Sequence, residues 1–346
     1  MTRRRFPLYA LTRARVLEFI REPEAVFWVF AFPVIMALVL GFAFRDHAPD
    51  RIPVGVAGGP GLAPLGGAAL QSPALKTSAF GTLEAGLQAL RTGKIALLVE
   101  ARDPLVYHFD PTRPDARLAR LEVDDAIQRA AGRKDPVQFR EEPMHEKGSR
   151  YIDFLLPGIL GLNLMGTGIW GIGFGIVNAR LKKTLKLMTA TPMRKSEYLL
   201  AQIFSRFVFL ILEIAVILLF GVLAFGVPIR GSLALLLSTA LLGSLAFAGL
   251  GLLVAARAQT LEAASGLMNF VMVPMWLLSG VFFSAERFPN AAQPLIRALP
   301  LTALNDALRA VMLEGRGLAA IAGQLALLVA WGLVTFGIAL KIFRWQ

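Results

Sequence analysis

Two glycine-containing segments come closest to the motifs that bind nucleotides. Gly166–Gly171 reads G-T-G-I-W-G and matches the G-x-G-x-x-G pattern that holds a dinucleotide pyrophosphate. That chemistry needs a strand before the glycines, whereas this segment lies inside a long apolar run, so we interpret the match as fortuitous. A P-loop needs a lysine after its second glycine, and the nearest approach, Gly81–Gly86, is followed by Leu87. The sequence therefore predicts that this chain does not hydrolyse ATP through a P-loop.

Metal-ligating and nucleophilic residues are few and poorly spaced for catalysis. His145-Glu146 begins like the zinc motif H-E-x-x-H, but the fourth residue after the histidine is Ser149. His47 and His108 have no partner at ligand spacing, and the chain has no cysteine. No G-x-S-x-G segment is present. We therefore expect no catalytic residue, no metal and no cofactor on this chain, and we do not expect it to be an enzyme.

The composition is that of a membrane protein. Of 346 residues, 55% are hydrophobic and only 17% are charged, and the mean hydropathy is +0.59. Soluble domains carry roughly a quarter charged residues, so this chain is expected to lie in a membrane. Six apolar stretches are long enough to cross a bilayer as helices. The predicted fold class is an α-helical membrane protein of six transmembrane helices, with a small extracytoplasmic α/β domain between the first and second.

The positive charges predict how the chain is oriented. Most of the net charge of +12 flanks the spans on one side, whereas the polar insert of residues 45–150 holds 15 basic and 14 acidic residues. Basic residues mark the cytoplasmic side of a membrane protein. We therefore expect a multi-pass protein of the cell (inner) membrane, with both termini cytoplasmic and the insert outside. Because the charges flank spans and form no single patch, we expect contact with membrane lipid and not with nucleic acid.

These patterns divide the chain into eight predicted segments. They are residues 1–24, a cytoplasmic N-terminal interfacial helix; 25–44, the first span; 45–150, the extracytoplasmic α/β domain; 151–177, the second span; 178–206, a basic cytoplasmic segment; 207–264, the third and fourth spans with a short cytoplasmic loop; 265–318, the fifth span and an outer hairpin; and 319–346, the sixth span and a cytoplasmic tail.

Short patterns predict the elements of the insert. Strands are expected over Ile52–Ala57, Ile95–Val99 and Leu105–Phe109, and helices over Thr82–Thr92 and Asp115–Ala131. The second of these helices is expected to turn Leu118, Leu121 and Ile127 inward.

Polar residues and glycines inside the spans are candidates for function. Glu213 lies seven residues past Arg206, so it is roughly 10 Å along the helix and within the membrane. A carboxylate there costs about 2 to 3 kcal/mol. It either lines a substrate path, together with Asn163 and Asn269, or pairs with a neighbouring helix, or reaches toward the inner surface.

Glycines of the second span permit close helix packing. Gly171 and Gly175 are four residues apart and therefore share one helix face. They serve either tight packing within one subunit or a seam between two subunits.

The connection after the second span is basic. Ala179–Ala190 predicts an amphipathic helix that carries Lys182, Lys183 and Lys186, and Thr191-Pro192 ends it. A second helix is expected to run from Ser196 into the third span. By its chemistry alone, the basic helix lies on anionic lipid or binds a cytoplasmic partner.

One predicted span, a large outer insert and five further spans follow one another along the chain, and Arg180–Leu200 and Leu278–Arg309 carry two local patterns within them. With this topology and these patterns, the chain resembles the membrane subunit of ABC-2 type exporters over nearly its whole length. Arg180–Leu200 looks like the coupling segment of that family, and Leu278–Arg309 looks like its outer re-entrant hairpin. Many members carry E-x-G-T before the T-P pair. Aligning on Thr184 places Leu181 at the glutamate and Lys183 at the glycine, so a contact made by that glutamate does not carry over.

The resemblance implies an exporter half that acts with other chains. A P-loop ABC ATPase, which holds the ATP and Mg²⁺, would dock against the coupling segment, and a second permease copy or a paralogue would complete the pair. The outer domain would bind a periplasmic adaptor or only gate the exit. The implied contacts to the ATPase are Lys182, Lys183, Lys186, Thr191, Pro192, Arg194 and Arg257.

Two other functions fit the same residues. One is a self-contained ion channel or proton-coupled transporter that uses Glu213. The other is a membrane-tethered receptor, although six spans are more membrane than an anchor needs.

Overall fold

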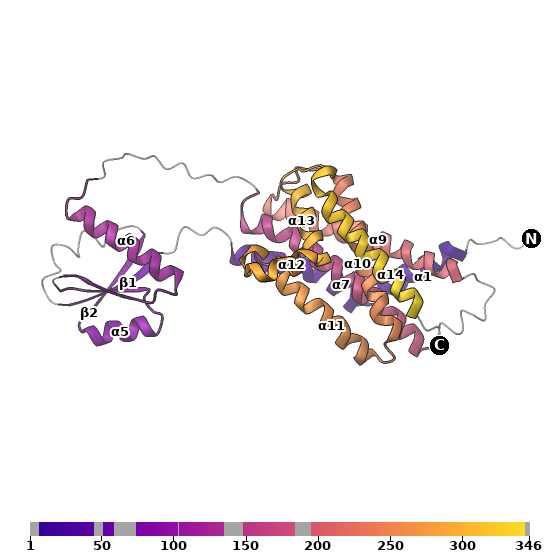
Figure 1. The fold of residues 1–346 in the computed structure, drawn as a ribbon, viewed down its shortest axis with the longest axis horizontal. Coiled ribbons are helices and arrows are strands. Elements are labelled where there is room, and N and C mark those ends of the chain that lie inside the picture. Colours follow the sequence, from indigo (N-terminus) through magenta and orange to yellow (C-terminus); the bar gives the residue numbers. More distant parts are fainter. Residues whose placement is uncertain are drawn as a thin grey trace, which may run out of the picture. The chain divides into compact units, whose positions relative to one another are not determined.

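The chain forms two structural units. The computed structural model describes residues 7–44, 51–58, 74–102, 104–134, 148–183 and 195–342. Contacts within the chain divide it into a helical unit, residues 1–45 with 145–346, and a smaller unit, residues 46–144. Figure 1 labels several elements of each unit.

The helical unit contains six helices long and apolar enough to cross a membrane among the described residues. The first is continuous through α2 (Pro23–Val26), the π-helical turn η1 (Phe27–Ala31) and α3 (Phe32–Ala43). The others are α7 (Tyr151–Leu181), α9 (Lys195–Phe225), α10 (Leu233–Arg257), α11 (Leu261–Leu278) and α14 (Ala322–Ile342) with its leading turn η5 (Leu318–Ile321). These helices confirm the predicted fold class, because there are six of them among the described residues and the strands of the mixed sheet come between the first and second along the sequence.

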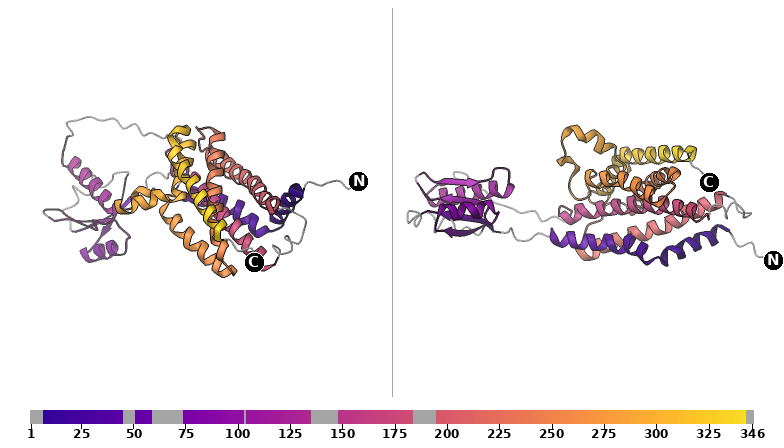
Figure 2. Two further views of the ribbon diagram at one scale, coloured as in Figure 1. Left: turned by 45° about the vertical axis from the view of Figure 1, so that its right-hand side comes forward. Right: turned by 90° about the horizontal axis from the view of Figure 1, so that it is seen from below.

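Helix α7 lies at the centre of the bundle. It packs against α3, α9, α10 and α11, and α10 also packs against α14 (Figure 2). Large apolar side chains on the outer faces are exposed, among them Leu223, Phe270 and Leu333. Exposed apolar surface of this extent is rare on soluble monomers, so lipid or another subunit has to cover it.

A short helix precedes the first span. This helix, α1 (Pro7–Ile20), packs against α9, and its Phe19 ring lies 4.2 Å from that of Phe209. Tyr9 and Ile20 of the same helix are exposed.

Two short helices connect the fifth and sixth spans. Helix α12 (Gln293–Ala298) follows the turns η3 (Ala285–Arg287) and η4 (Asn290–Ala292), and α13 (Pro300–Met312) follows α12. Helix α13 packs against α7, α10 and α14 and is buried for most of its length. This packing agrees with the resemblance to a re-entrant hairpin, which remains a prediction.

Two helix boundaries differ from those predicted. Helix α7 continues to Leu181, so residues 179–181, predicted to begin the basic helix, belong to the helix of the second span, and residues 184–190 of that predicted helix lie outside the described residues. The break comes at Lys183, whose φ of 54° is left-handed. Helix α11 begins at Leu261, four residues before the predicted start of the fifth span, and it ends at Leu278, after which Gly280 turns the chain with a φ of 68°.

The smaller unit is an α/β domain built on a four-stranded sheet. Its strands are β1 (Ile52–Ala57), β2 (Leu75–Phe80), β3 (Leu97–Glu100) and β4 (Val106–Phe109), in the order β2-β1-β3-β4. Strand β1 pairs parallel with β2 and β3, with Val54 opposite Thr77 and Leu97, and β4 pairs antiparallel with β3. Helix α6 (Pro114–Ala130) covers one face and α5 (Leu83–Arg91) the other (Figure 1).

The orientation of α6 corrects one expectation. Ile127 is buried as predicted, but Leu118 and Leu121 are 50% and 63% exposed. Ala116 and Ala119 face the sheet instead. Small side chains let the helix approach the strands closely, whereas the prediction placed the larger apolar residues inward.

Candidate functional site

A polar contact inside the membrane links the first span to α7. Pro33 has no backbone N–H, so it cannot supply the hydrogen bond that the Val29 carbonyl would receive in a regular α-helix. Asn163 of α7 donates from Nδ2 to the Val29 oxygen at 3.2 Å. An unpaired carbonyl in lipid costs several kcal/mol, so the amide of Asn163 stabilises the π-helical turn of the first span.

Glu213 joins the same region from α9. Its side chain is only 1% exposed, and Thr167 Oγ lies 3.1 Å from Glu213 Oε2 and 2.8 Å from the Asn163 carbonyl oxygen. The hydroxyl hydrogen of Thr167 is therefore within reach of both oxygens. We call Asn163, Thr167 and Glu213 the inner polar cluster, because it connects the first span, α7 and α9.

Two of the three residues predicted to line a substrate path belong to the inner polar cluster. Asn163 and Glu213 are linked through Thr167, a residue that the sequence analysis had not singled out. The contact with α7 favours the interpretation that Glu213 pairs with a neighbouring helix over the one in which it reaches toward the surface. Asn269 is exposed on α11 and lies outside this cluster.

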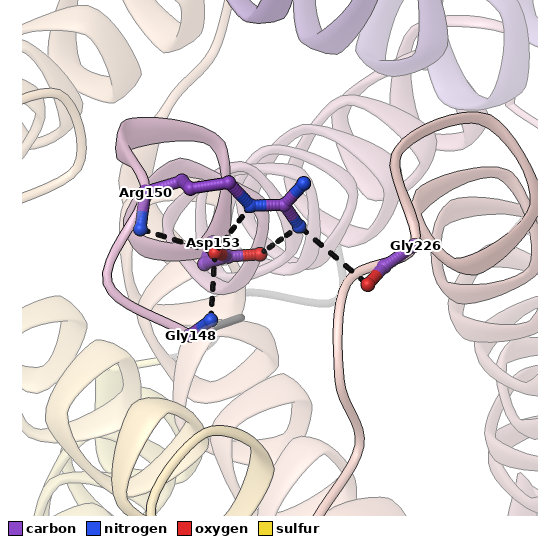
Figure 3. A network of polar contacts seen from close by, with 4 residues as sticks. All are labelled: Gly148, Arg150, Asp153 and Gly226. Atoms are coloured by element: carbon purple, nitrogen blue, oxygen red, sulfur yellow. Dashed lines mark hydrogen bonds and ion pairs between the residues drawn. The ribbon is translucent and has the colours of Figure 1, made fainter. Parts of the chain in front are cut away.

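A second polar network fixes the first turn of α7 (Figure 3). Asp153 is fully buried and accepts hydrogen bonds from the backbone N–H groups of Gly148 and Arg150 at 2.9 and 3.1 Å. The Arg150 guanidinium donates to both Asp153 oxygens at 2.9 Å and to the Gly226 carbonyl at 3.5 Å. This network ties the start of α7 to the α9–α10 connection. An acidic residue three positions after a helix N-cap could have indicated it.

Helix α13 holds the chain just after α11. Asn305 donates from Nδ2 to the Ser279 carbonyl at 2.9 Å, and Arg309 donates to the Gly280 carbonyl. The Arg309 guanidinium also lies 3.7 Å above the Phe154 ring of α7. Carbonyls at a helix C-terminus lack partners within the helix, and two side chains one turn apart on α13 supply them here.

The basic end of α7 carries the first of the residues predicted to contact an ATPase. Lys182 and Lys183 are exposed there, and so is Arg257 at the end of α10. Lys186, Thr191, Pro192 and Arg194 lie outside the described residues.

Lys183 adopts a backbone conformation that suits glycine. Its φ is 54°, whereas Lys182 before it has a φ of −73°. The alignment with E-x-G-T places glycine at residue 183. The conformation thus explains why glycine would be used there, since a side chain in the left-handed region costs about 1 to 2 kcal/mol.

Replacing Lys183 by glycine is expected to raise the free energy of unfolding by about 0.5 to 1 kcal/mol, after allowance for the greater freedom of glycine in the unfolded chain. The thermal unfolding midpoint in detergent would measure it. The matched control is Lys182→Gly, where glycine relieves no strain and is expected to destabilise. A lower midpoint for Lys183→Gly than for the unaltered chain would contradict this account.

Two glycines of α7 have open space beside them. A Cβ atom built on Gly171 or Gly175 would meet no described atom within 4 Å. Within the described residues, these glycines therefore do not pack closely against another helix of the same subunit.

Comparison with known proteins places the chain among membrane transporters. A family model described as "ABC-2 family transporter protein" matches residues 24–341. The Escherichia coli K12 inner membrane transport permease YhhJ is 27% identical over half of this chain and 46% of its own length. ABC transporter G family member 20 of Dictyostelium discoideum is 31% identical over 49% of this chain and 23% of its own.

A third relative is similar over a region of the same size. The probable multidrug ABC transporter permease YbhS of Escherichia coli K12 is 27% identical over 47% of this chain and 43% of its own length. The aligned region thus spans less than half the length of these curated relatives. The family match, in contrast, covers nearly the whole of the six helices that, among the described residues, are long enough to cross a membrane. This chain therefore belongs to the ABC-2 family of transporter proteins.

Proposed function

We propose that the chain is the membrane-spanning permease subunit of an ABC-2 exporter, driven by ATP that a separate ATPase hydrolyses. The observation that carries this proposal is a family match over residues 24–341 in a sequence with no P-loop. ATP and Mg²⁺ would be bound by the partner ATPase. The names of two relatives, an inner membrane transport permease and a probable multidrug permease, support a place in the cell membrane and an export function.

The charge distribution supports an orientation. The exposed lysines at the end of α7 and Arg257 at the end of α10 would face the cytoplasm, as would both termini. The α/β domain would then lie outside, where it binds a periplasmic adaptor or gates the exit.

The cytoplasmic contact with the ATPase would begin at Lys182 and Lys183 and continue through Lys186, Thr191, Pro192 and Arg194. Arg257 would add a second point of contact. A basic segment of this kind suits an acidic groove on the partner.

A second permease copy or a paralogue would pack on the face of α7 that carries Gly171 and Gly175. The open space beside both glycines supports this seam, because another helix backbone could approach there closely.

The substrate path would pass the inner polar cluster, with Glu213 as its charged group. Glu213→Gln keeps a polar group within reach of Thr167 but removes the charge. We expect efflux of ethidium and of a panel of other drug probes to fall about tenfold, the effect of one lost interaction with a charged group. The unfolding midpoint should change little.

The control for this substitution is Thr167→Val, which removes the hydroxyl and keeps the charge. It is expected to lower the free energy of unfolding by about 1 kcal/mol and to leave efflux per folded molecule nearly unchanged. Equal efflux by Glu213→Gln and the unaltered chain would assign Glu213 a purely structural role.

Purification from the native membrane in mild detergent, followed by mass spectrometry, tests the proposed function. A P-loop ATPase in near-stoichiometric amount is the expected result. Substrate flux through liposomes that contain this chain and no ATPase would contradict the proposal.

A further inference from the structure

Helices α7 and α10 touch through their backbones. A Cβ atom on Gly251 of α10 would lie 2.7 Å from the Ile169 oxygen and 3.0 Å from the Gly168 oxygen of α7. A Cβ atom on Gly168 would in turn lie 2.7 Å from the Cβ atom of Phe247. Contacts this short leave no room for side chains between the two helices, so they form one closely packed pair.

Arg180, near the basic end of α7, links the same two helices by hydrogen bonds. Its Nη1 donates to the carbonyl oxygens of Ala255 and Ala258 at 3.0 and 2.7 Å. Helix α10 ends at Arg257, so both carbonyls belong to its last turn and cap, where partners within the helix are missing. A positive charge is also favourable at the negative end of a helix dipole. One nitrogen of α7 therefore caps α10.

This cap lies between the two places where the ATPase is proposed to bind. Arg180 is two residues before Lys182, and Ala258 directly follows Arg257. Only residues 258–260 separate α10 from α11. The guanidinium of Arg180 thus joins the start of the coupling segment to the short connection that leads into α11.

We infer that Arg180 is a positioning residue that makes residues 180–183, the described start of the coupling segment, and the α10–α11 connection move as one body. This inference rests on the proposed function, because it assigns a path for the movement that the ATPase imposes. Displacement of Lys182 and Lys183 is passed through Arg180 to Ala258 and so to α11. Without Arg180, Lys182 and Lys183 move while α11 stays in place.

The absence of cysteine from the sequence makes a direct distance measurement possible. Nitroxide labels on Lys182→Cys and Glu262→Cys report the separation between the end of α7 and the first turn of α11. In the detergent-solubilised full chain, the distance distribution is expected to be narrow. Arg180→Ala is expected to broaden it. Lys341→Ala, which removes an exposed positive charge from the end of α14, is expected to leave it narrow.

The complex with the ATPase supplies the second measurement. ATP with vanadate is expected to leave the label distance unchanged when Arg180 is present and to shift it by at least about 2 Å in Arg180→Ala. Arg180→Lys keeps the charge and loses the forked geometry, and an intermediate shift is expected. If Arg180→Ala does not fold, Arg180→Lys replaces it in both measurements.

The two measurements separate the possible failures. A narrow, unshifted distribution in Arg180→Ala, or in Arg180→Lys if only that variant folds, overturns the inference. A broadened distribution with no nucleotide-dependent shift also overturns it, because Arg180 then holds the fold without passing on movement. If no ATPase binds, the proposed function fails, and the width of the distribution in the chain alone still shows whether Arg180 fastens the two segments.

Discussion

Reversal of Lys182, Lys183 and Lys186 to glutamate is expected to abolish transport and leave the chain inserted in the membrane. Exposed ion pairs contribute about 0.2 to 1 kcal/mol each, and reversal replaces attraction by repulsion of similar size. Three reversals should therefore weaken ATPase binding by about 3 kcal/mol, or roughly a hundredfold. Co-purification of the ATPase with the tagged chain measures this loss.

The matched control reverses three exposed basic residues of the α/β domain, Lys76, Arg91 and Lys94. This variant undergoes the same change of net charge far from the proposed docking surface along the sequence, and it should retain the ATPase. Normal transport by the Lys182, Lys183 and Lys186 variant would show that the coupling segment has been wrongly assigned.

Asp153→Ala is expected to lower the free energy of unfolding by about 2 to 4 kcal/mol, because it removes a fully buried carboxylate acceptor, whereas the Arg150 side chain, which is 33% exposed, can turn toward water. The substitution leaves the backbone N–H groups of Gly148 and Arg150 without the carboxylate oxygen that they bind, whereas the Arg150 guanidinium keeps its contact with the Gly226 carbonyl. The thermal unfolding midpoint in detergent would report the loss.

The chain offers a control of the same residue types at the same spacing. Asp306 and Arg309 are also three residues apart, but the Asp306 side chain is 52% exposed and its oxygen lies 3.9 Å from the Arg309 nitrogen. Asp306→Ala should therefore change the free energy of unfolding by less than about 1 kcal/mol. Equal effects of the two substitutions would show that burial does not decide the strength of the Asp153 network.

The insert shows how far sequence patterns predict local structure. Strand β1 was predicted with its observed ends, because apolar residues stop at a glycine and proline turn. Strand β2 was missed, since Leu75 is its only buried residue and its exposed positions show no alternation. The buried face of α6 was misassigned because the spacing of apolar residues does not reveal how closely a helix approaches a sheet.

In the helical unit, too, some features could be predicted from the sequence and others could not. Length and hydropathy were enough to predict six spans, because the bilayer sets both. Glu213 stood out as a charge in an apolar helix, but its contact with Thr167 depends on how α7 and α9 are aligned, which neither segment encodes alone. Asp153 was passed over because it lies in the first turn of the predicted second span, and its burial depends on contacts with Gly148, Arg150 and Gly226 that the spacing of residues does not show.

The link between Val29 and Asn163 has a consequence for the order of biosynthesis. The two residues are 134 positions apart, and the α/β domain lies between them. At about 5 to 20 residues per second, a ribosome needs roughly 7 to 27 s to reach Asn163 after it has passed Val29. During that interval the first span carries a carbonyl that its own helix cannot pair, and only water or the insertion machinery can. The first span therefore reaches its final hydrogen bonding only after the outer domain has been translated and α7 has entered the membrane beside it.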